Sequence, residues 1–158
     1  MAKAVFRIEH RVGVPTPASV VWRVISNLSG WSDWNPLYTR AQGQLRIGER
    51  LTLTEQVPGQ GKRVIVPTVV DWVPDIQILW RMSQGGMLRR FRYLEIDKLS
   101  DEACIFSNGE DWWGLSARFI GKSRRRAMRQ AFEAMGEAVR DRAVALWRAE
   151  GGAPTSEP

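Results

Sequence analysis

Hydrophobic residues recur with a period of two in some stretches of the chain and with a period of three to four in others. Apolar and polar residues alternate along residues 3–12, which predicts a half-buried strand. Between residues 39 and 112, short alternating runs are separated by Gly, Pro, Asp and Ser, and they predict six more strands joined by tight turns. The six runs are residues 39–47, 50–57, 62–73, 76–82, 87–99 and 102–112.

A period of three to four residues marks the helices. It is longest over residues 119–148, where one face carries Met128, Phe132, Met135, Val139, Ala143 and Leu146. A shorter helix is expected to begin at Pro15-Thr16-Pro17 and to end at Ser29-Gly30. A second short helix follows and stops before Pro36, because the residue before a proline is disfavoured in the helical conformation.

The order strand, two short helices, six strands and one long helix predicts an α+β fold. A curved antiparallel sheet has one face to cover, and only residues 119–148 form a helix long enough to cover it. We therefore expect a helix-grip fold, in which a seven-stranded curved antiparallel sheet wraps around the long C-terminal helix. A single domain is expected over residues 1–148, and the small polar residues of 149–158 predict a disordered tail.

Composition limits the sites that the chain can build. His10 is the only histidine and Cys104 the only cysteine, so we expect no metal site, no Ser-His-Asp triad and no intrachain disulfide. No cofactor is predicted. The sequence shows no signal segment and no apolar run of about 18 residues, which predicts a cytoplasmic protein. The net charge of +6 favours contact with anions but does not identify them.

Several short strings, taken in order, resemble the START/birch-pollen-allergen-like superfamily (SRPBCC), in particular its polyketide cyclase/dehydrase and lipid-transport branch. They are Val14-Pro15-Thr16-Pro17-Ala18 before Val21-Trp22, Trp34-Asn35-Pro36, Ile47-Gly48-Glu49-Arg50-Leu51, Pro74 with Leu79-Trp80, Phe91, and Glu110 with Gly114. The resemblance covers residues 5–147. It implies a cavity between sheet and long helix that holds a hydrophobic small molecule, but it does not choose between carriers and enzymes.

Glu110 is the most informative polar residue. Strict alternation places it on one strand face with Cys104, Phe106, Asn108 and Trp112, and we expect this face to line the cavity. Desolvation in an apolar pocket favours the protonated form of a carboxylate, as a general acid requires. Two alternatives stay open: Glu110 pairs with an arginine such as Arg89 or Arg92, or it lies in water at the cavity mouth.

The predicted ligand site draws on the short helices, the sheet and the long helix. Its members are Trp34, Asn35, Trp80, Phe91, Tyr93, Phe106, Asn108, Glu110, Trp112, Met128, Phe132 and Met135. Phe91 and Tyr93 share a strand face that we expect to point inward, whereas Trp34-Asn35-Pro36 also fits a simple helix terminator. Gly136 lies inside the long helix, where glycine is unfavourable by about 1 kcal/mol relative to alanine. A close approach of helix to sheet, which would pinch the cavity, explains that glycine.

A basic run opens the long helix and consists of Lys122, Arg124, Arg125, Arg126 and Arg129. A helix beginning at Ser123 would place three arginines in its first turn, against the helix dipole, unless an anion binds there. A helix beginning near Ser116, with a break at Gly121, would leave the run as a solvated face. An anionic membrane surface is the other partner considered. Nucleic acid is not expected, because no aromatic residues interleave the run.

Three hypotheses follow. The leading one is a binding protein that sequesters or transports a hydrophobic or amphipathic small molecule, such as a lipid or polyketide-like compound. The second is a cyclase or dehydratase with Glu110 as acid/base and Asn108 or Tyr93 orienting a carbonyl group. The third is an interaction protein with a filled core, whose basic helix face meets a partner or a membrane. The sequence does not determine the oligomeric state.

Overall fold

The computed structural model describes residue 4, residues 6–84 and residues 88–152. After β1 (Phe6–Val14) come the helix α1 (Ala18–Ser26) and the 3-10 helix η1 (Leu28–Asp33). The remaining strands are β2 (Tyr38–Gln42), β3 (Thr52–Gln56), β4 (Lys62–Ile65), β5 (Thr68–Val73), β6 (Gln77–Gln84), β7 (Leu88–Ser100) and β8 (Ala103–Trp113). A second 3-10 helix, η2 (Leu115–Phe119), leads into the long helix α2 (Lys122–Ala149). The predicted α+β helix-grip fold is confirmed, with eight strands in the described residues instead of seven.

The strands form two antiparallel sheets. One has five strands in the order β1-β8-β7-β6-β5, and the other has three in the order β2-β3-β4. A bridge between Arg50 and Thr68 joins the two sheets, and the Leu51 N–H donates to the Pro67 carbonyl at 2.9 Å beside it. The expected strand 62–73 is therefore two strands. Pro67, which has no N–H to give to a ladder, separates β4 from β5.

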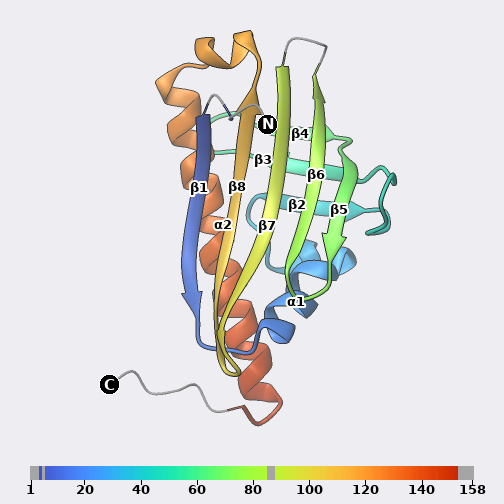
Figure 1. The fold of residues 1–158 in the computed structure, drawn as a ribbon, viewed down its shortest axis with the longest axis vertical. Helices are drawn as coiled ribbons and strands as arrows, with labels where there is room; N and C mark the ends of the chain where they lie inside the picture. The colour runs from blue at the N-terminus through green and yellow to red at the C-terminus, as the bar shows by residue number, and fades with distance from the viewer. Residues whose placement is uncertain (1–3, 5, 85–87, 153–158) are drawn as a thin grey trace.

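The helix α2 covers one face of the five-stranded sheet (Figure 1). It runs along β1 and β8, while β2, β3 and β4 cross behind β6 and β5. The helix α1 lies near the lower end of the sheet in this view. The predicted apolar stripe is confirmed, because the buried residues of α2 are Met128, Ala131, Phe132, Met135, Gly136, Val139 and Ala143. No helix among the described residues is long and apolar enough to cross a bilayer.

Gly136 allows α2 to approach the sheet closely, as the sequence predicts. A Cβ atom on Gly136 would lie 2.5 Å from Cδ2 of His10 on β1 and 3.3 Å from Oδ1 of Asn108 on β8. Both distances are below normal van der Waals contact, so any side chain here would push the helix away from the sheet.

The helix α2 begins later than expected, at Lys122 instead of residue 119. Gly121 precedes its first residue, and residues 115–119 form the separate element η2, so the expected break at Gly121 is confirmed. Lys122 and the first arginines therefore do occupy the first turn, which contains no acidic residue. The interpretation that moved the helix start back to Ser116 is wrong.

The described structure also continues beyond residue 148, the predicted end of the domain. Ala149 is the last residue of α2, and Nη1 of Arg23 lies 2.6 Å from Oε1 of Glu150. The predicted tail 149–158 thus begins too early in the sequence, and its residues 153–158 lie outside the described residues. Three other predicted positions also lie outside them: the strand start at Lys3, the turn at Gly85-Gly86 and the strand start at Met87.

Candidate functional site

Strand β7 turns two arginines toward the interior of the protein. The side chains of Arg90 and Arg92 are each 1% exposed. The guanidinium of Arg92 lies 5.7 Å from the ring centre of Phe132 on α2, and that of Arg90 lies 4.8 Å from the ring of Trp112 on β8. Buried charges of this kind are unfavourable unless they are paired, so their partners define the site.

The alternation of β7 places Phe91 and Tyr93 on the opposite face. Phe91 packs edge-to-face on Trp113, and the Tyr93 hydroxyl donates to the carboxylate of Glu9. The prediction that these two rings point inward is wrong. Arginine usually lies on the solvent side of a strand, but here Arg90 and Arg92 take the inner side. Tyr93 also packs over Gly109, where a Cβ atom would lie 2.6 Å from the tyrosine oxygen.

Glu110 lies opposite Arg92 on the neighbouring strand β8 and is 0% exposed. Nε of Arg92 donates to Oε2 of Glu110, and Nη1 of Arg90 lies 3.5 Å from Oε1. The alternative in which Glu110 pairs with Arg92 is confirmed, and the alternative of a water-exposed carboxylate at a cavity mouth is wrong. Both carboxylate oxygens face guanidinium groups, which are strong charge-assisted donors.

A second buried carboxylate, Glu55 of β3, completes the cluster. Its Oε1 lies 2.5 Å from Nη1 of Arg92, and its Oε2 lies 2.7 Å from Nη2 of Arg63. The same Nη1 of Arg92 donates to the hydroxyl of Tyr38 on β2 at 2.9 Å. These contacts join the three-stranded sheet to the five-stranded sheet. We call Tyr38, Glu55, Arg90, Arg92 and Glu110 the interior charge cluster.

The cluster sets the protonation states of its members. Burial by itself would lower the pKa of Arg92, but Glu110, Tyr38 and Glu55 outweigh it and raise that pKa well above its usual value. Burial would likewise raise the pKa of Glu55, yet Arg92 and Arg63 hold it below its usual value. Burial raises the pKa of Tyr38 to about 12, against the effect of Arg92. At neutral pH the cluster therefore contains a cation, a carboxylate and a neutral phenol at these three positions.

Arg90 is the least satisfied member of the interior charge cluster. Its Nε and Nη2 atoms have no hydrogen-bond partner among the described residues. Burial, followed by the charges of Arg92, Arg124 and Arg63 and opposed by Glu110, lowers the pKa of Arg90 to about 10, so it is still a cation at neutral pH. Arg90 also lines a cavity of about 220 Å³ between β4 and the β6–β7 pair.

Most of the other predicted site residues do face the interior. Those buried to within 2% exposure are Trp80, Phe106, Asn108, Trp112, Met128, Phe132 and Met135. The ring of Trp80 lies 6.4 Å from Trp31 and 6.0 Å from Tyr38, so it belongs to an aromatic cluster that joins η1, β2 and β6. Asn108 is fully buried, and neither atom of its amide group has a partner among the described residues.

Trp34 and Asn35 end η1, as the helix-terminator interpretation predicts. Trp34 is half-buried against Trp31, with ring centres 6.3 Å apart. Oδ1 of Asn35 accepts hydrogen bonds from the backbone N–H groups of Leu37 and Tyr38, both at 3.0 Å. The side-chain amide oxygen of Asn35 therefore stabilises the turn into β2.

Comparisons with known proteins identify the family. The model of the family described as polyketide cyclase / dehydrase and lipid transport matches residues 5–146 of the 158 residues. The chain belongs to this family. No curated protein matches the chain in sequence.

Solved structures share the fold of this family member at low sequence identity. A START superfamily protein from Mycobacterium smegmatis is 18% identical, with a TM-score of 0.71 over 89% of this chain and 98% of that one. The Zhui aromatase/cyclase from Streptomyces sp. R1128 is 21% identical, with a TM-score of 0.71 over 94% and 99%. The major latex-like protein 151 of Panax ginseng is 8% identical, with a TM-score of 0.70 over 88% and 97%. These structures share the START-like helix-grip fold of this chain.

The basic run of this family member divides into two parts. The half-buried Arg124 and Arg125 lie over aromatic rings, with guanidinium carbons 5.9 Å from Trp112 and 4.3 Å from Phe6 respectively. The aromatic faces offset the unfavourable position of these arginines at the helix start. The remaining members, Lys122, Arg126 and Arg129, are exposed. The solvated-face interpretation therefore holds for these three and is wrong for Arg124 and Arg125.

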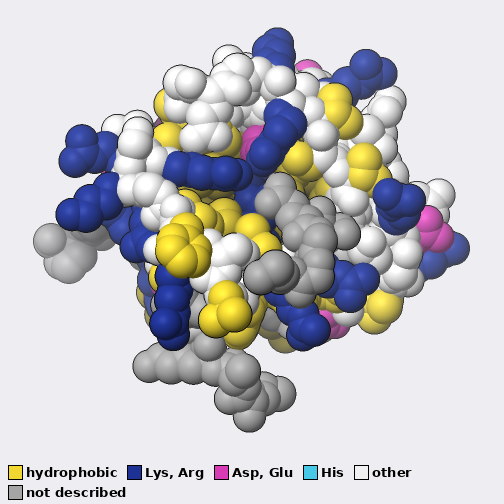
Figure 2. Space-filling view, turned by 90° about the horizontal axis from the view of Figure 1, so that it is seen from above, with side chains coloured by type: hydrophobic (Ala, Val, Ile, Leu, Met, Phe, Trp, Pro, Cys, Tyr) yellow, Lys and Arg dark blue, Asp and Glu magenta, His cyan; other side chains and the backbone are white. Residues whose placement is uncertain are grey.

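Exposed apolar residues accompany the basic ones at this end of the molecule. Phe119 is 87% exposed and Leu115 is 68% exposed, and both belong to η2, directly before α2. Figure 2, which looks down on this end, shows Lys and Arg side chains gathered around exposed hydrophobic ones. We call Leu115, Phe119, Lys122, Arg126 and Arg129 the basic end face.

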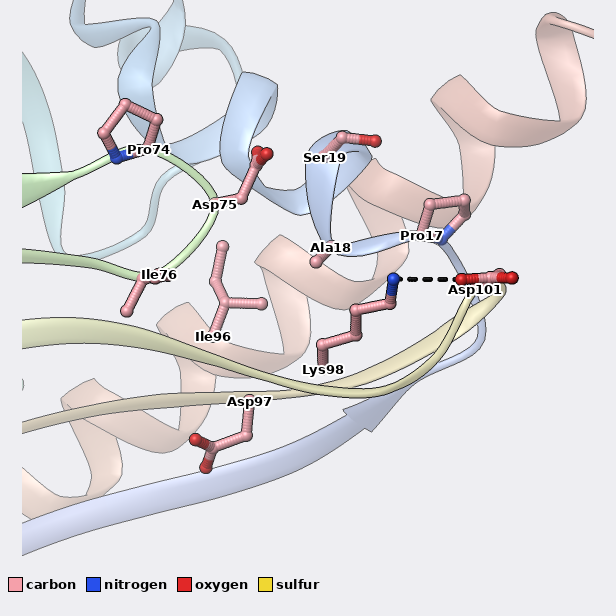
Figure 3. Close-up of a pocket in the computed structure, with 10 residues that line it drawn as sticks. All are labelled: Pro17, Ala18, Ser19, Pro74, Asp75, Ile76, Ile96, Asp97, Lys98 and Asp101. Carbon is pink, nitrogen blue, oxygen red and sulfur yellow. Dashed lines mark ion pairs between the residues drawn. The ribbon is translucent and has the colours of Figure 1, made fainter.

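A larger hollow lies at the opposite end, between the start of α1, the β5–β6 turn and the β7–β8 hairpin (Figure 3). Its volume is about 650 Å³, and Nζ of Lys98 pairs with Asp101 at 2.9 Å across its rim. Both side chains of that pair are mostly exposed, and none of the predicted site residues lines the hollow. Within the described ranges, no group of three or more His, Cys, Asp or Glu side chains could hold a metal ion.

The predicted site includes Glu110, and the sequence analysis names Arg92 only as its possible ion-pair partner. Tyr38, Glu55, Arg90 and Arg92 were not predicted as site residues. One signal for Glu55 was present in the sequence, because Leu51, Leu53 and Val57 occupy the same alternating face and all three are buried. A carboxylate at an apolar position of a strand needs a buried cation as its partner. The sequence of that strand alone does not show which other strand supplies the cation.

Proposed function

We propose that the protein binds a hydrophobic or amphipathic small molecule, such as a lipid or polyketide-like compound, and carries or sequesters it in the cytoplasm. The family match and the START-like fold support a ligand-binding role. The observation that carries the proposal is the 220 Å³ cavity between β4 and the β6–β7 pair. Its wall combines apolar side chains with the buried cation of Arg90, which suits a ligand with a polar end.

The interior beside this cavity can adapt to an apolar ligand. Met82 lines the cavity, and Met128 and Met135 form part of the buried face of α2. Methionine side chains are flexible and polarisable, so they accommodate different shapes at small energetic cost. The cavity lining does not itself include Met128, Phe132 or Met135. Contact of the helix wall with a ligand therefore remains a prediction.

Native mass spectrometry of the purified protein, followed by titration with the neutral apolar dye Nile red, tests this function. We expect a co-purifying small molecule, or saturable dye binding that Val66→Trp weakens at least tenfold by filling the cavity. Val66 is partly exposed at the cavity rim, so the substitution should leave the fold intact. Ile76 lines the hollow at the opposite end of the molecule, so Ile76→Trp is the matched control. Absence of any bound molecule and of saturable dye binding would overturn the proposal.

A cyclase or dehydratase that uses Glu110 as acid/base is the second candidate. Glu110 is a fully buried carboxylate on the interior face, and Asn108 on the same face has an unpartnered amide that could orient a carbonyl group. Tyr93 faces the other side of the sheet and does not fit that role. The test compares turnover of a polyketide-like substrate by the natural protein and by Glu110→Gln. Unchanged ligand binding with no measurable turnover in either form would exclude the enzyme hypothesis.

A further inference from the structure

Arg90 presents one unused edge of its guanidinium group inside the protein. Nη1 approaches Glu110 at 3.5 Å, whereas Nε and Nη2 have no hydrogen-bond partner among the described residues. The side chain is 1% exposed, so bulk water has little access to these donors. A buried charged donor without an acceptor is unfavourable, and such a group in a native protein calls for a functional explanation.

Another arginine of this chain shows what that edge can hold. Nε of Arg7 donates to Oδ1 of Asp111 at 2.6 Å, and Nη2 donates to Oδ2 at 2.9 Å. The two donors on the Nε–Nη2 edge thus engage both oxygens of one carboxylate, in the bidentate geometry typical of arginine. Arg90 has the same edge without an acceptor.

The charged groups around Arg90 carry a net positive charge. Arg63, Arg92 and Arg124 all act on Arg90 as neighbouring positive charges, and Glu110 is the carboxylate that opposes them. Glu55 adds a second carboxylate, but it is already engaged by Arg92 and Arg63. Two buried guanidinium groups, with the partly exposed Arg63 and Arg124 beside them, therefore share two buried carboxylates. An added anion would lower the repulsion among them.

The cavity at Arg90 has the size and lining of a head-group site. Its volume of about 220 Å³ is below the roughly 300–1,000 Å³ of pockets that enclose a whole drug-sized ligand. Besides Arg90 and Arg63, it is lined by apolar side chains and Pro67. Such a site fits the charged end of a mainly apolar molecule, or a small organic acid.

We infer that the bound molecule carries an oxyanion, a carboxylate or a phosphate, and that the Nε–Nη2 edge of Arg90 holds it, with Arg63 alongside. The inference rests on the ligand-binding function proposed above and specifies the chemical class of its ligand. It assigns Arg90 the role of selecting acids over neutral molecules of the same length. Glu110 then holds the other side of the guanidinium and fixes its orientation.

Binding of three probes of equal chain length tests this inference: decanoate, decyl phosphate and decanol, each followed by isothermal titration calorimetry. We expect at least one of the two anions to bind about tenfold to a hundredfold more tightly than decanol, as charge-assisted hydrogen bonds imply. The preference between decanoate and decyl phosphate identifies the oxyanion. Arg90→Gln should remove the preference for the anion while decanol binding stays unchanged. Arg90→Lys, which keeps the charge but loses the planar edge, should retain only part of it.

Arg89→Gln is the matched control, because Arg89 is the exposed neighbour on the opposite face of the same strand. It should bind all three probes as the natural protein does. Equal binding of anions and decanol by the natural protein would overturn the anion site and leave the proposed function standing. Failure of all three probes to bind would overturn both. If Arg90→Gln does not fold, Arg90→Lys decides alone, and an undiminished anion preference in that variant overturns the role of the guanidinium edge.

Discussion

Arg92 and Glu110 face each other across β7 and β8 at one register position, and their side chains are 1% and 0% exposed. Arg92 also contacts Glu55 of β3, so the pair connects the two sheets. A buried pair of this kind adds less to stability than its Coulomb energy suggests, because both groups lose their hydration. It does, however, impose a strong penalty on any structure in which one partner is missing.

Removal of Arg92 should therefore be severe. We expect Arg92→Gln to reduce the free energy of unfolding by about 3–5 kcal/mol, since Glu110 and Glu55 would then be buried with reduced compensation. Urea denaturation followed by tryptophan fluorescence measures this change. Arg89→Gln, on the exposed side of the same strand, should stay within about 0.5 kcal/mol of the natural protein. A loss below about 1 kcal/mol for Arg92→Gln would contradict the assigned role of the pair.

Gly136→Ala should destabilise the protein although alanine favours helix. The new methyl group would lie 2.5 Å from Cδ2 of His10, so the helix or the histidine must move. We expect a loss of about 1–3 kcal/mol, typical of an overpacked contact, measured by chemical denaturation. The double variant His10→Ala with Gly136→Ala removes the clash. The two substitutions should therefore be non-additive, and the added cost of Gly136→Ala in the free energy of unfolding should largely disappear when His10 is already alanine. Additive losses would show that the contact with His10 is not the cause.

The stability of the protein should fall in acid partly through Glu55. Arg92 and Arg63 outweigh burial and hold the pKa of Glu55 below the usual 4.5 in the folded protein. Ionised Glu55 therefore stabilises the fold at neutral pH, and this contribution is lost as the pH falls below about 4.5 and through the folded pKa. In denaturation curves from pH 7 to pH 3, the natural protein and Glu55→Gln should converge as the pH falls.

The exposed Glu133 is the control for this pH dependence. Glu133→Gln should follow the natural protein at every pH. A difference between the natural protein and Glu55→Gln that stays constant down to pH 3 would contradict the contribution of Glu55 ionisation.

The basic end face should bind anionic membranes. We expect the protein to sediment with vesicles of phosphatidylcholine and phosphatidylserine, but not with vesicles of phosphatidylcholine alone, and to be released by salt. Each basic residue near such a surface is worth about 1 kcal/mol, so the double variant Lys122→Gln with Arg126→Gln should weaken binding at least tenfold. Phe119→Ala should weaken binding in the absence of a charge change, because its ring is 87% exposed.

The double variant Arg142→Gln with Arg148→Gln removes the same charge from exposed positions in the C-terminal part of α2, away from the basic end face. It should leave vesicle binding unchanged. An equal loss for both double variants would show that net charge, and not this face, attracts the protein to the vesicles.

Local periodicity in the sequence determined the order of the elements, the buried stripe of α2 and the inward face of β8. The close approach at Gly136 was predictable for a similar reason, because a helix-interior glycine is unfavourable unless a neighbour requires it. Each of these features depends on residues close together in the chain. The boundary at Pro67, which divides one predicted strand into two, is also a local signal, because proline has no N–H to donate to a ladder.

The direction in which β7 faces was decided only by the tertiary structure. Alternation shows that Arg90 and Arg92 share one face and that Phe91 and Tyr93 share the other, but it does not show which face is inside. Aromatic rings usually take the interior, and here two arginines do so because Glu55 and Glu110 arrive from β3 and β8 to compensate them. Burial of a charge depends on partners from distant strands, and the pattern of a single strand does not contain them.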